Sequence, residues 1–261
     1  TDRSRGLGDV YKRQTWYSTG GGFDYAWSPD GKWFTLEFTG NKHDPYSDIG
    51  LVSAEGGKDI INLTNSGYMS GYPHFALDGN AILFTTERYG MRAHASWGSL
   101  NDAMLVFLNQ DAYDKYCLSK EDYELRKELE KEQKKSAGKD TPQGKNKDKK
   151  KKYDKKDSNA DEKDDQPKDI VVELKGIEDR VVRLTPNSSD MGSTIISKDG
   201  ETLYYLAAFE GGYDLWKMNL RKKETKLLHK MDAGWADMQL DKDGKNLFLL
   251  GSRKMQKMDT S

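Results

Sequence analysis

The sequence has little that would cross-link the chain or anchor it in a membrane. Cys117 is its one cysteine in 261 residues, so an internal disulfide is impossible and the redox compartment stays open. No apolar run approaches the roughly 20 residues that cross a bilayer, so we expect no membrane span. The formal net charge of −1 gives no overall attraction to nucleic acid, and we expect no nucleic-acid partner.

Motifs for catalysis and for cofactor binding are lacking as well. The chain has no G-x-S-x-G nucleophile elbow and no G-x-x-x-x-G-K phosphate loop, and the GGG run at 20–22 is more typical of a tight turn. Cys117 has no histidine near it in the sequence. No metal-ligand spacing links the four histidines, His43, His74, His94 and His229. We therefore expect no catalytic, cofactor-binding or metal-binding residue in this chain.

Residues 1–14, TDRSRGLGDVYKRQ, resemble a translated adapter rather than natural sequence. The alternative is a natural N-terminal segment. On the first interpretation the natural start and any signal peptide are missing, so we leave this stretch out of the fold prediction.

Four Asp-Gly pairs share the same surroundings. The aspartates are Asp30, Asp78, Asp199 and Asp243. The positions three residues before, four after and six after each aspartate are apolar or aromatic in all four copies. The last two positions share one face of a strand, since side chains alternate with period two. Each copy predicts two strands joined at a type I′ Asp-Gly turn.

A second pattern follows each hairpin. The segments at 48–64 and 169–185 both begin Asp-Ile and end Leu-Thr, and 214–230 has a similar shape, which predicts a second strand pair. The resulting unit of four antiparallel strands recurs every 44 to 48 residues where it is uninterrupted, as expected for a β-propeller blade. An open β-sandwich is the alternative fold.

The predicted fold class is therefore all-β, a partial β-propeller of three blades and part of a fourth. We place the blades at 15–64, 65–185, 186–230 and 231–261. Because propellers of 4–8 blades close into a ring, we expect this chain to be a fragment of a longer protein.

The second blade carries an insertion of about 75 residues, which we place at 88–168, between its second and third strands. Residues 119–135 predict a helix with Ser119 as N-cap and Asp122 in the capping-box position. Residues 131–169 hold 14 lysines and 10 acids, so we expect disorder over about 136–168. A solvated spacer is the favoured interpretation, and contact with a polyanion is the alternative.

Two surface features leave a binding role open. The loop TGNKHDPYSD at 39–48 is rich in polar residues and favours either a ligand site or an ordinary surface loop. Asn62 and Asn187 each begin a glycosylation pattern, although such patterns are common by chance.

WSPDGKW at 27–33 with DIGLVSAEGGKDIINLT at 48–64 resembles the short propeller repeat (PD40, WD40-like) of TolB, of prolyl oligopeptidases and of tricorn-type proteases. SWGSLNDAMLVFLNQDAYDKY at 96–116, the Lys-rich insertion and GIEDRVVRLTPNSSD at 176–190 resemble bacterial tricorn-like S41 serine peptidases more specifically. The resemblance covers about 16–261.

The resemblance implies a non-catalytic propeller segment that gates or guides peptides to a serine peptidase core downstream. It implies peptide or unfolded-protein substrates, a homo-oligomeric parent, and a periplasmic location more than a cytoplasmic one. No residue here matches that family's catalytic motifs. The alternatives are a stand-alone TolB-like protein-binding propeller and the propeller of a prolyl-oligopeptidase-type enzyme.

Overall fold

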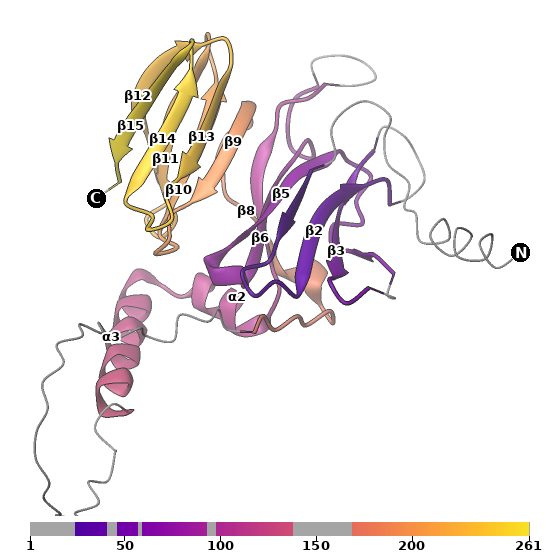
Figure 1. Ribbon diagram of the computed structural model, residues 1–261, viewed down its shortest axis with the longest axis vertical. Helices are drawn as coiled ribbons and strands as arrows, with labels where there is room; N and C mark the ends of the chain where they lie inside the picture. Colours follow the sequence, from indigo (N-terminus) through magenta and orange to yellow (C-terminus); the bar gives the residue numbers. More distant parts are fainter. Residues whose placement is uncertain (1–23, 41–45, 57–58, 93–97, 138–168, 261) are drawn as a thin grey trace, which may run out of the picture.

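The computed structural model describes residues 24–40, 46–56, 59–92, 98–137 and 169–260, and in them four antiparallel sheets follow one another along the chain (Figure 1). The first two are blade 1, with β1 (Tyr25–Trp27), β2 (Trp33–Phe38), β3 (Asp48–Ser53) and β4 (Ile61–Asn62), and blade 2, with β5 (Ser70–Ala76), β6 (Ala81–Thr86), β7 (Asp102–Phe107) and β8 (Val181–Arg183). The others are blade 3, with β9 (Asp190–Ile196), β10 (Thr202–Ala208), β11 (Tyr213–Asn219) and β12 (Glu224–Ala233), and blade 4, with β13 (Ala236–Leu240), β14 (Asn246–Gly251) and β15 (Lys254–Asp259). The predicted all-β arrangement of propeller blades is confirmed.

Hydrophobic cores lie between successive blades rather than inside any one of them. The apolar residues four and six positions after each Asp-Gly aspartate face the preceding blade: Ile82 and Phe84 pack on blade 1, Leu203 and Tyr205 on blade 2, Leu247 and Leu249 on blade 3. All six are nearly or fully buried. The opposite faces supply the partners, such as Leu51, Leu105 and Leu206. The repeat therefore records which face of each sheet is covered by its neighbour.

The Asp-Gly turns of blades 1, 3 and 4 differ from the predicted type I′ form, whereas in blade 2 Leu77 and Asp78 both have a positive φ of +54°. In blade 1, Gly31 N–H donates to the Ser28 carbonyl at 3.0 Å, and Gly31 alone has a positive φ, +68°, in the 28–32 loop. Loops of this length are commonly built around a type I turn. The Asp30 carboxylate accepts from Lys32 N–H at 3.1 Å, and the Ser28 hydroxyl accepts from Trp33 N–H at 2.9 Å. These side-chain acceptors stabilise the longer loop over a two-residue type I′ turn. The Asp-Gly pair alone does not show which of the two forms.

The insertion lies between the third and fourth strands of blade 2, which corrects the predicted position. The third strand is β7, whose Met104 pairs with Phe84 of β6 and with Arg183 of β8. Residues 169–175, predicted to be that strand, contain no strand. β7 occupies the place because all six of its residues are buried. The segment 169–175 instead passes the Asp-Gly turns of blades 1 and 2, where Ile170 N–H donates to Asp30 Oδ2 at 2.9 Å and the Ile170 side chain lies against Gly79.

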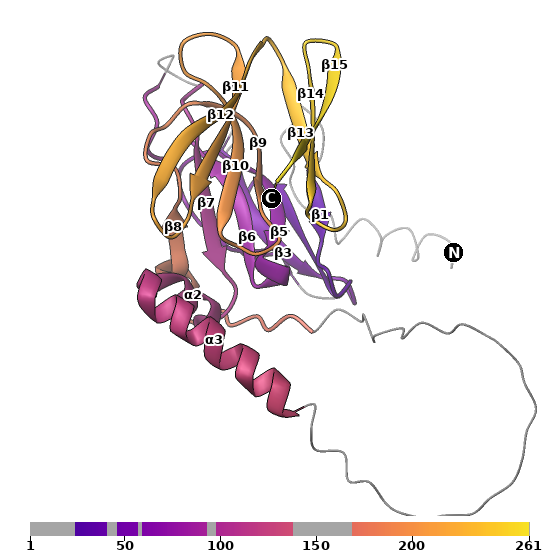
Figure 2. The same ribbon diagram turned by 90° about the vertical axis from the view of Figure 1, so that its left-hand side faces the viewer.

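Two helices follow β7, α2 (Gln110–Cys117) and α3 (Lys120–Ala137), and Figure 2 shows them at one end of the blades. The prediction of α3 is confirmed, including its cap: Asp122 N–H donates to Ser119 Oγ at 3.1 Å. α2 was not predicted. The disorder expected for 136–168 falls almost entirely outside the described residues. No helix of the described segments is long and apolar enough to cross a membrane.

One arginine of blade 3 holds both helices. The guanidinium of Arg221 lies 3.8 Å from the ring centroid of Tyr123 in α3 and 5.6 Å from that of Tyr116 in α2. It also donates to the carbonyls of Lys115 and Tyr116, at 3.1 and 2.6 Å. A planar guanidinium can stack and donate together, which an ammonium cannot.

Replacing Arg221 with lysine should therefore loosen the helices without unfolding the sheets. We expect amide hydrogen exchange over 110–130 to rise at least tenfold, while exchange in β9, β10 and β11 stays unchanged. Lys120→Gln is the matched control, because it removes an exposed ion pair with Glu124 that lies within α3. Equal exchange in wild type and R221K would show that Arg221 does not hold the helices.

The glycines of the turns give a second test. A Cβ at Gly200, where φ is +73°, would lie 2.7 Å from Leu77 Cδ2 of blade 2, whereas at Gly31 it would meet nothing within 4 Å. We expect G31A to lower the free energy of unfolding by about 1 kcal/mol through backbone strain alone. G200A should cost clearly more, and G67A, in open space without a positive φ, should change little. Urea denaturation of the three variants checks this order.

Candidate functional site

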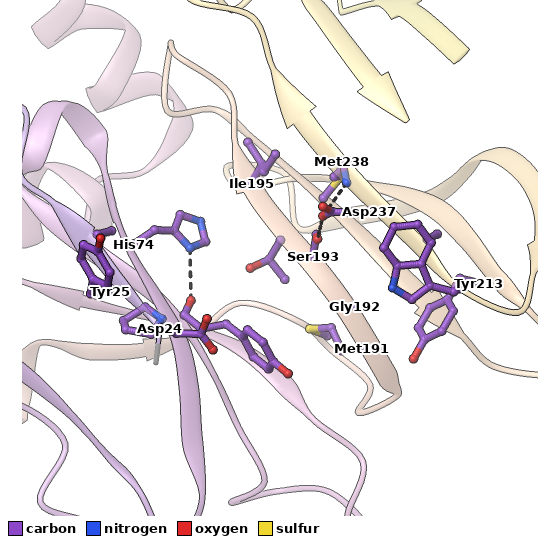
Figure 3. A pocket seen from close by; sticks show the side chains of 16 residues that line it. Asp24, Tyr25, His74, Met191, Gly192, Ser193, Ile195, Tyr213, Asp237 and Met238 are labelled. Atoms are coloured by element: carbon purple, nitrogen blue, oxygen red, sulfur yellow. Dashed lines mark hydrogen bonds between the residues drawn. The ribbon is translucent and has the colours of Figure 1, made fainter. Parts of the chain in front are cut away.

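The innermost strands of the four blades, β1, β5, β9 and β13, together border a groove of about 600 Å³, the axial groove (Figure 3). Its lining runs from the start of β1 to the start of β13. These strands stand side by side because the cores described above hold the blades face to face. The groove is thus a product of the whole four-blade arc.

The same repeat position supplies one wall residue from each blade. Six residues before the Asp-Gly aspartate stand Asp24, Tyr72, Ser193 and Asp237, and all four line the groove. The position lies within the inner strand, or in blade 1 just before it. α2 and α3 instead border the Asp78 and Asp199 turns, so the helices lie outside the groove lining.

β-bulges shape the two middle strands. The pairing of β5 with β6 shifts between Gly71 and His74, and that of β9 with β10 shifts between Met191 and Thr194, so each inner strand has one extra residue. Tyr72 lies within the first bulge with a positive φ of +54°. A non-glycine residue in this region is strained, and bulges often re-aim side chains beside binding sites.

The aromatic side chains of the groove are exposed. Tyr25, Tyr72 and Trp235 have 57%, 65% and 59% of their surface accessible, although each lines the groove. Tyr213, a fourth aromatic, donates its hydroxyl to Asp190 Oδ1 at 2.8 Å, and burial raises its pKa to about 12. Exposed rings gathered in a concavity are typical of sites that bind protein segments.

The charged side chains of the groove lining are acidic. Asp24 and Asp237 line it, and no lysine or arginine is among the described residues that do. Asp237 Oδ1 accepts from the Ser193 hydroxyl and from Met238 N–H. Just behind the lining, burial raises the pKa of Glu37, and the negative charge of Asp24 adds to the rise.

The ring of His74 lies between two backbone segments of the groove. Its Nδ1 lies 3.2 Å from the Tyr72 carbonyl, and the ring also interacts with the backbone of Thr194. The hydroxyl of Thr194, a nearly fully buried groove residue, has no hydrogen-bond partner among the described residues. Figure 3 shows the His74 ring directed from β5 toward β9. Burial lowers the pKa of His74, so the ring is neutral at pH 7.

The other residues considered from the sequence do not meet at one place. Cys117 is exposed at the end of α2, His229 lies in β12, and His43 and His94 fall outside the described residues. In the 39–48 loop, residues 41–45 are outside them too, while Asp48 accepts from Asn62 and Thr64, which ties up the side-chain amide of one glycosylation pattern. Within the described part of the chain, no three His, Cys, Asp or Glu side chains are placed to hold a metal ion.

Similar solved structures share the fold at low sequence identity. The crystal structure of the tricorn protease matches with a TM-score of 0.55 and 11% identity over 93% of this chain. A protein described as TolB from Agrobacterium tumefaciens matches with a TM-score of 0.50 and 13% identity over 91% of this chain. This chain spans only 21% of the first protein and 61% of the second. No protein-family model and no curated protein matches it in sequence.

His74 gives a prediction for the dependence of stability on pH. Its folded-state pKa is lowered, so below pH 6.5 the unfolded chain takes up a proton that the folded chain does not. This part of the stability is present above about pH 6.5 and is lost as the pH falls, by up to about 1.4 kcal/mol at pH 5.5. Urea denaturation at pH 7.5 and 5.5 should show a smaller loss for H74Q than for wild type. An equal loss in both would contradict the assignment.

Proposed function

We propose that this chain is the non-catalytic binding propeller of a tricorn-like serine peptidase, and that its axial groove holds or guides peptide segments. The observation that carries the proposal is the groove itself, where exposed aromatic rings from blades 1, 2 and 4 converge on one concavity. The shared propeller fold of the tricorn protease and the resemblance of the insertion and its flanks support the peptidase context.

The groove suits binding better than chemistry. Its serine, Ser193, donates its hydroxyl to Asp237, and no histidine hydrogen bond to it occurs in the described residues. A serine nucleophile needs a neighbouring base to take its proton. The proposed role for this chain is therefore to hold a segment of substrate, with bond cleavage assigned to another part of a longer protein.

A stand-alone binding propeller is the second candidate, supported by the shared fold of the TolB protein. The two candidates differ in the ligand. A substrate-guiding groove binds extended peptides of varied sequence, whereas a docking propeller binds the folded surface of one partner.

The test uses fluorescein-labelled fragments of unfolded casein, with binding followed by anisotropy and cleavage followed by mass spectrometry. We expect binding without cleavage. Tyr72→Ala combined with Trp235→Ala should weaken binding at least tenfold, because aromatic anchors carry much of the energy of such contacts. Met255→Ala is the matched control, since Met255 is exposed but lies on β15, outside the groove lining.

Two results would contradict the proposal. Absence of binding, or equal binding by the double variant and wild type, would remove the groove from the function. Turnover of the peptides by the pure chain would show that the chain is itself a peptidase.

A further inference from the structure

The charged groups of the axial groove are hydrogen-bond acceptors. They are the carboxylates of Asp24 and Asp237, which accept only. The described lining contains no ammonium or guanidinium group that could neutralise the carboxylates. A ligand that satisfies these carboxylates must bring hydrogen-bond donors, and a cationic N–H donor also balances their charge.

An unpartnered atom is a second observation, independent of the acidic residues. Thr194 Oγ1, in the groove lining, is buried and makes no hydrogen bond among the described residues. A buried polar atom without a partner is destabilising, so a ligand that supplies the partner binds more tightly. An N–H donor fits this atom, since a hydroxyl oxygen accepts hydrogen bonds.

The electrostatic field of the groove is negative. Burial raises the pKa of Tyr72, and the negative charges of Asp24 and Glu37 raise it further. Asp24 likewise adds to the raised pKa of Glu37. Ionisation of either group is opposed because another negative charge is close by. An acidic ligand would meet the same repulsion.

The aromatic rings of the groove favour particular cationic side chains of a ligand, namely lysine and arginine. Tyr25, Tyr72 and Trp235 present exposed ring surface beside the carboxylates. Lysine and arginine pack their apolar stems on such rings and hold their charge over the ring face. The carboxylates come from blades 1 and 4, the two outer blades of the arc, so a ligand that reaches both must be longer than one side chain.

We propose that the axial groove selects extended polypeptide segments that carry lysine or arginine, with Asp24 and Asp237 receiving the cationic side chains. This inference rests on the proposed function, because it names the class of peptide that the groove takes. It predicts a preference set by the groove and not by the chain as a whole, whose net charge is only −1.

The experiment compares three fluorescein-labelled 12-residue peptides that share a Gly-Ser-Tyr scaffold and carry lysine, glutamine or glutamate at the same four positions. Anisotropy with the full chain at 0.05 and 0.2 M NaCl gives the dissociation constants. We expect the lysine peptide to bind at least tenfold more tightly than the glutamine peptide, and the glutamate peptide to bind most weakly. The lysine preference should shrink at the higher salt concentration.

Variants locate the preference. D24N and D237N should each reduce at least threefold the ratio of the affinity for the lysine peptide to the affinity for the glutamine peptide. E55Q, an exposed glutamate in the turn after β3, changes the net charge equally and is the control. Thermal denaturation of each variant checks that the fold is kept.

The outcomes separate this inference from the proposed function. Binding of all three peptides with equal affinity, or tightest binding of the glutamate peptide, would overturn the cationic preference and leave a peptide-binding groove in place. Equal effects of E55Q and the two groove variants would also overturn it, because the attraction would then be general. Binding of none of the peptides would overturn both.

Discussion

The constraint on which the structure depends is that each four-stranded sheet has two apolar faces and can cover neither alone. Blade 2 shows it most clearly: Ile82 and Phe84 on one face pack against blade 1, while Leu83 and Leu105 on the other pack against blade 3. Burying such a side chain contributes roughly 1.5–3 kcal/mol, so stacking is the main source of stability in every blade. The axial groove follows from this, since stacked blades bring their innermost strands to one axis.

Much of the fold could be predicted because this constraint produces a repeating pattern of apolar residues in the sequence. Apolar residues at fixed distances from Asp30, Asp78 and Asp199 reveal strand pairs, their spacing and the covered face. The prediction was wrong where two segments, or two turn forms, could each satisfy the local pattern. Both 102–107 and 169–175 have apolar residues suited to a strand, and their order in space depends on burial beside β6, which no local pattern reports. In blade 1 the form of the turn depends on the side chain of Ser28, which is not one of the repeat positions that reveal the strands.

The candidate site was less accessible to prediction, because no motif marks it. The residue type at the groove position differs between blades, being aspartate, tyrosine or serine. A motif search needs the same residue type in each copy and therefore misses the position. The repeat register held the missing signal: the position six residues before each turn aspartate lines the axis in every blade. His74 could be set aside as a metal ligand from its spacing, but its place in the groove depends on how β5 lies beside β9, which no local pattern reports.

The bulges of β5 and β9 affect how the lining of the axial groove can change through substitution. A bulge absorbs one residue within a single strand and then returns the chain to its former pairing, so Phe75 and Ile82 still face each other beyond it. Substitutions or length changes at Tyr72 or Ser193 can therefore alter what the axis presents while the stacked faces stay as they are. Blades with such a bulge in their inner strand can acquire new ligand preferences without changes to the hydrophobic cores between the blades.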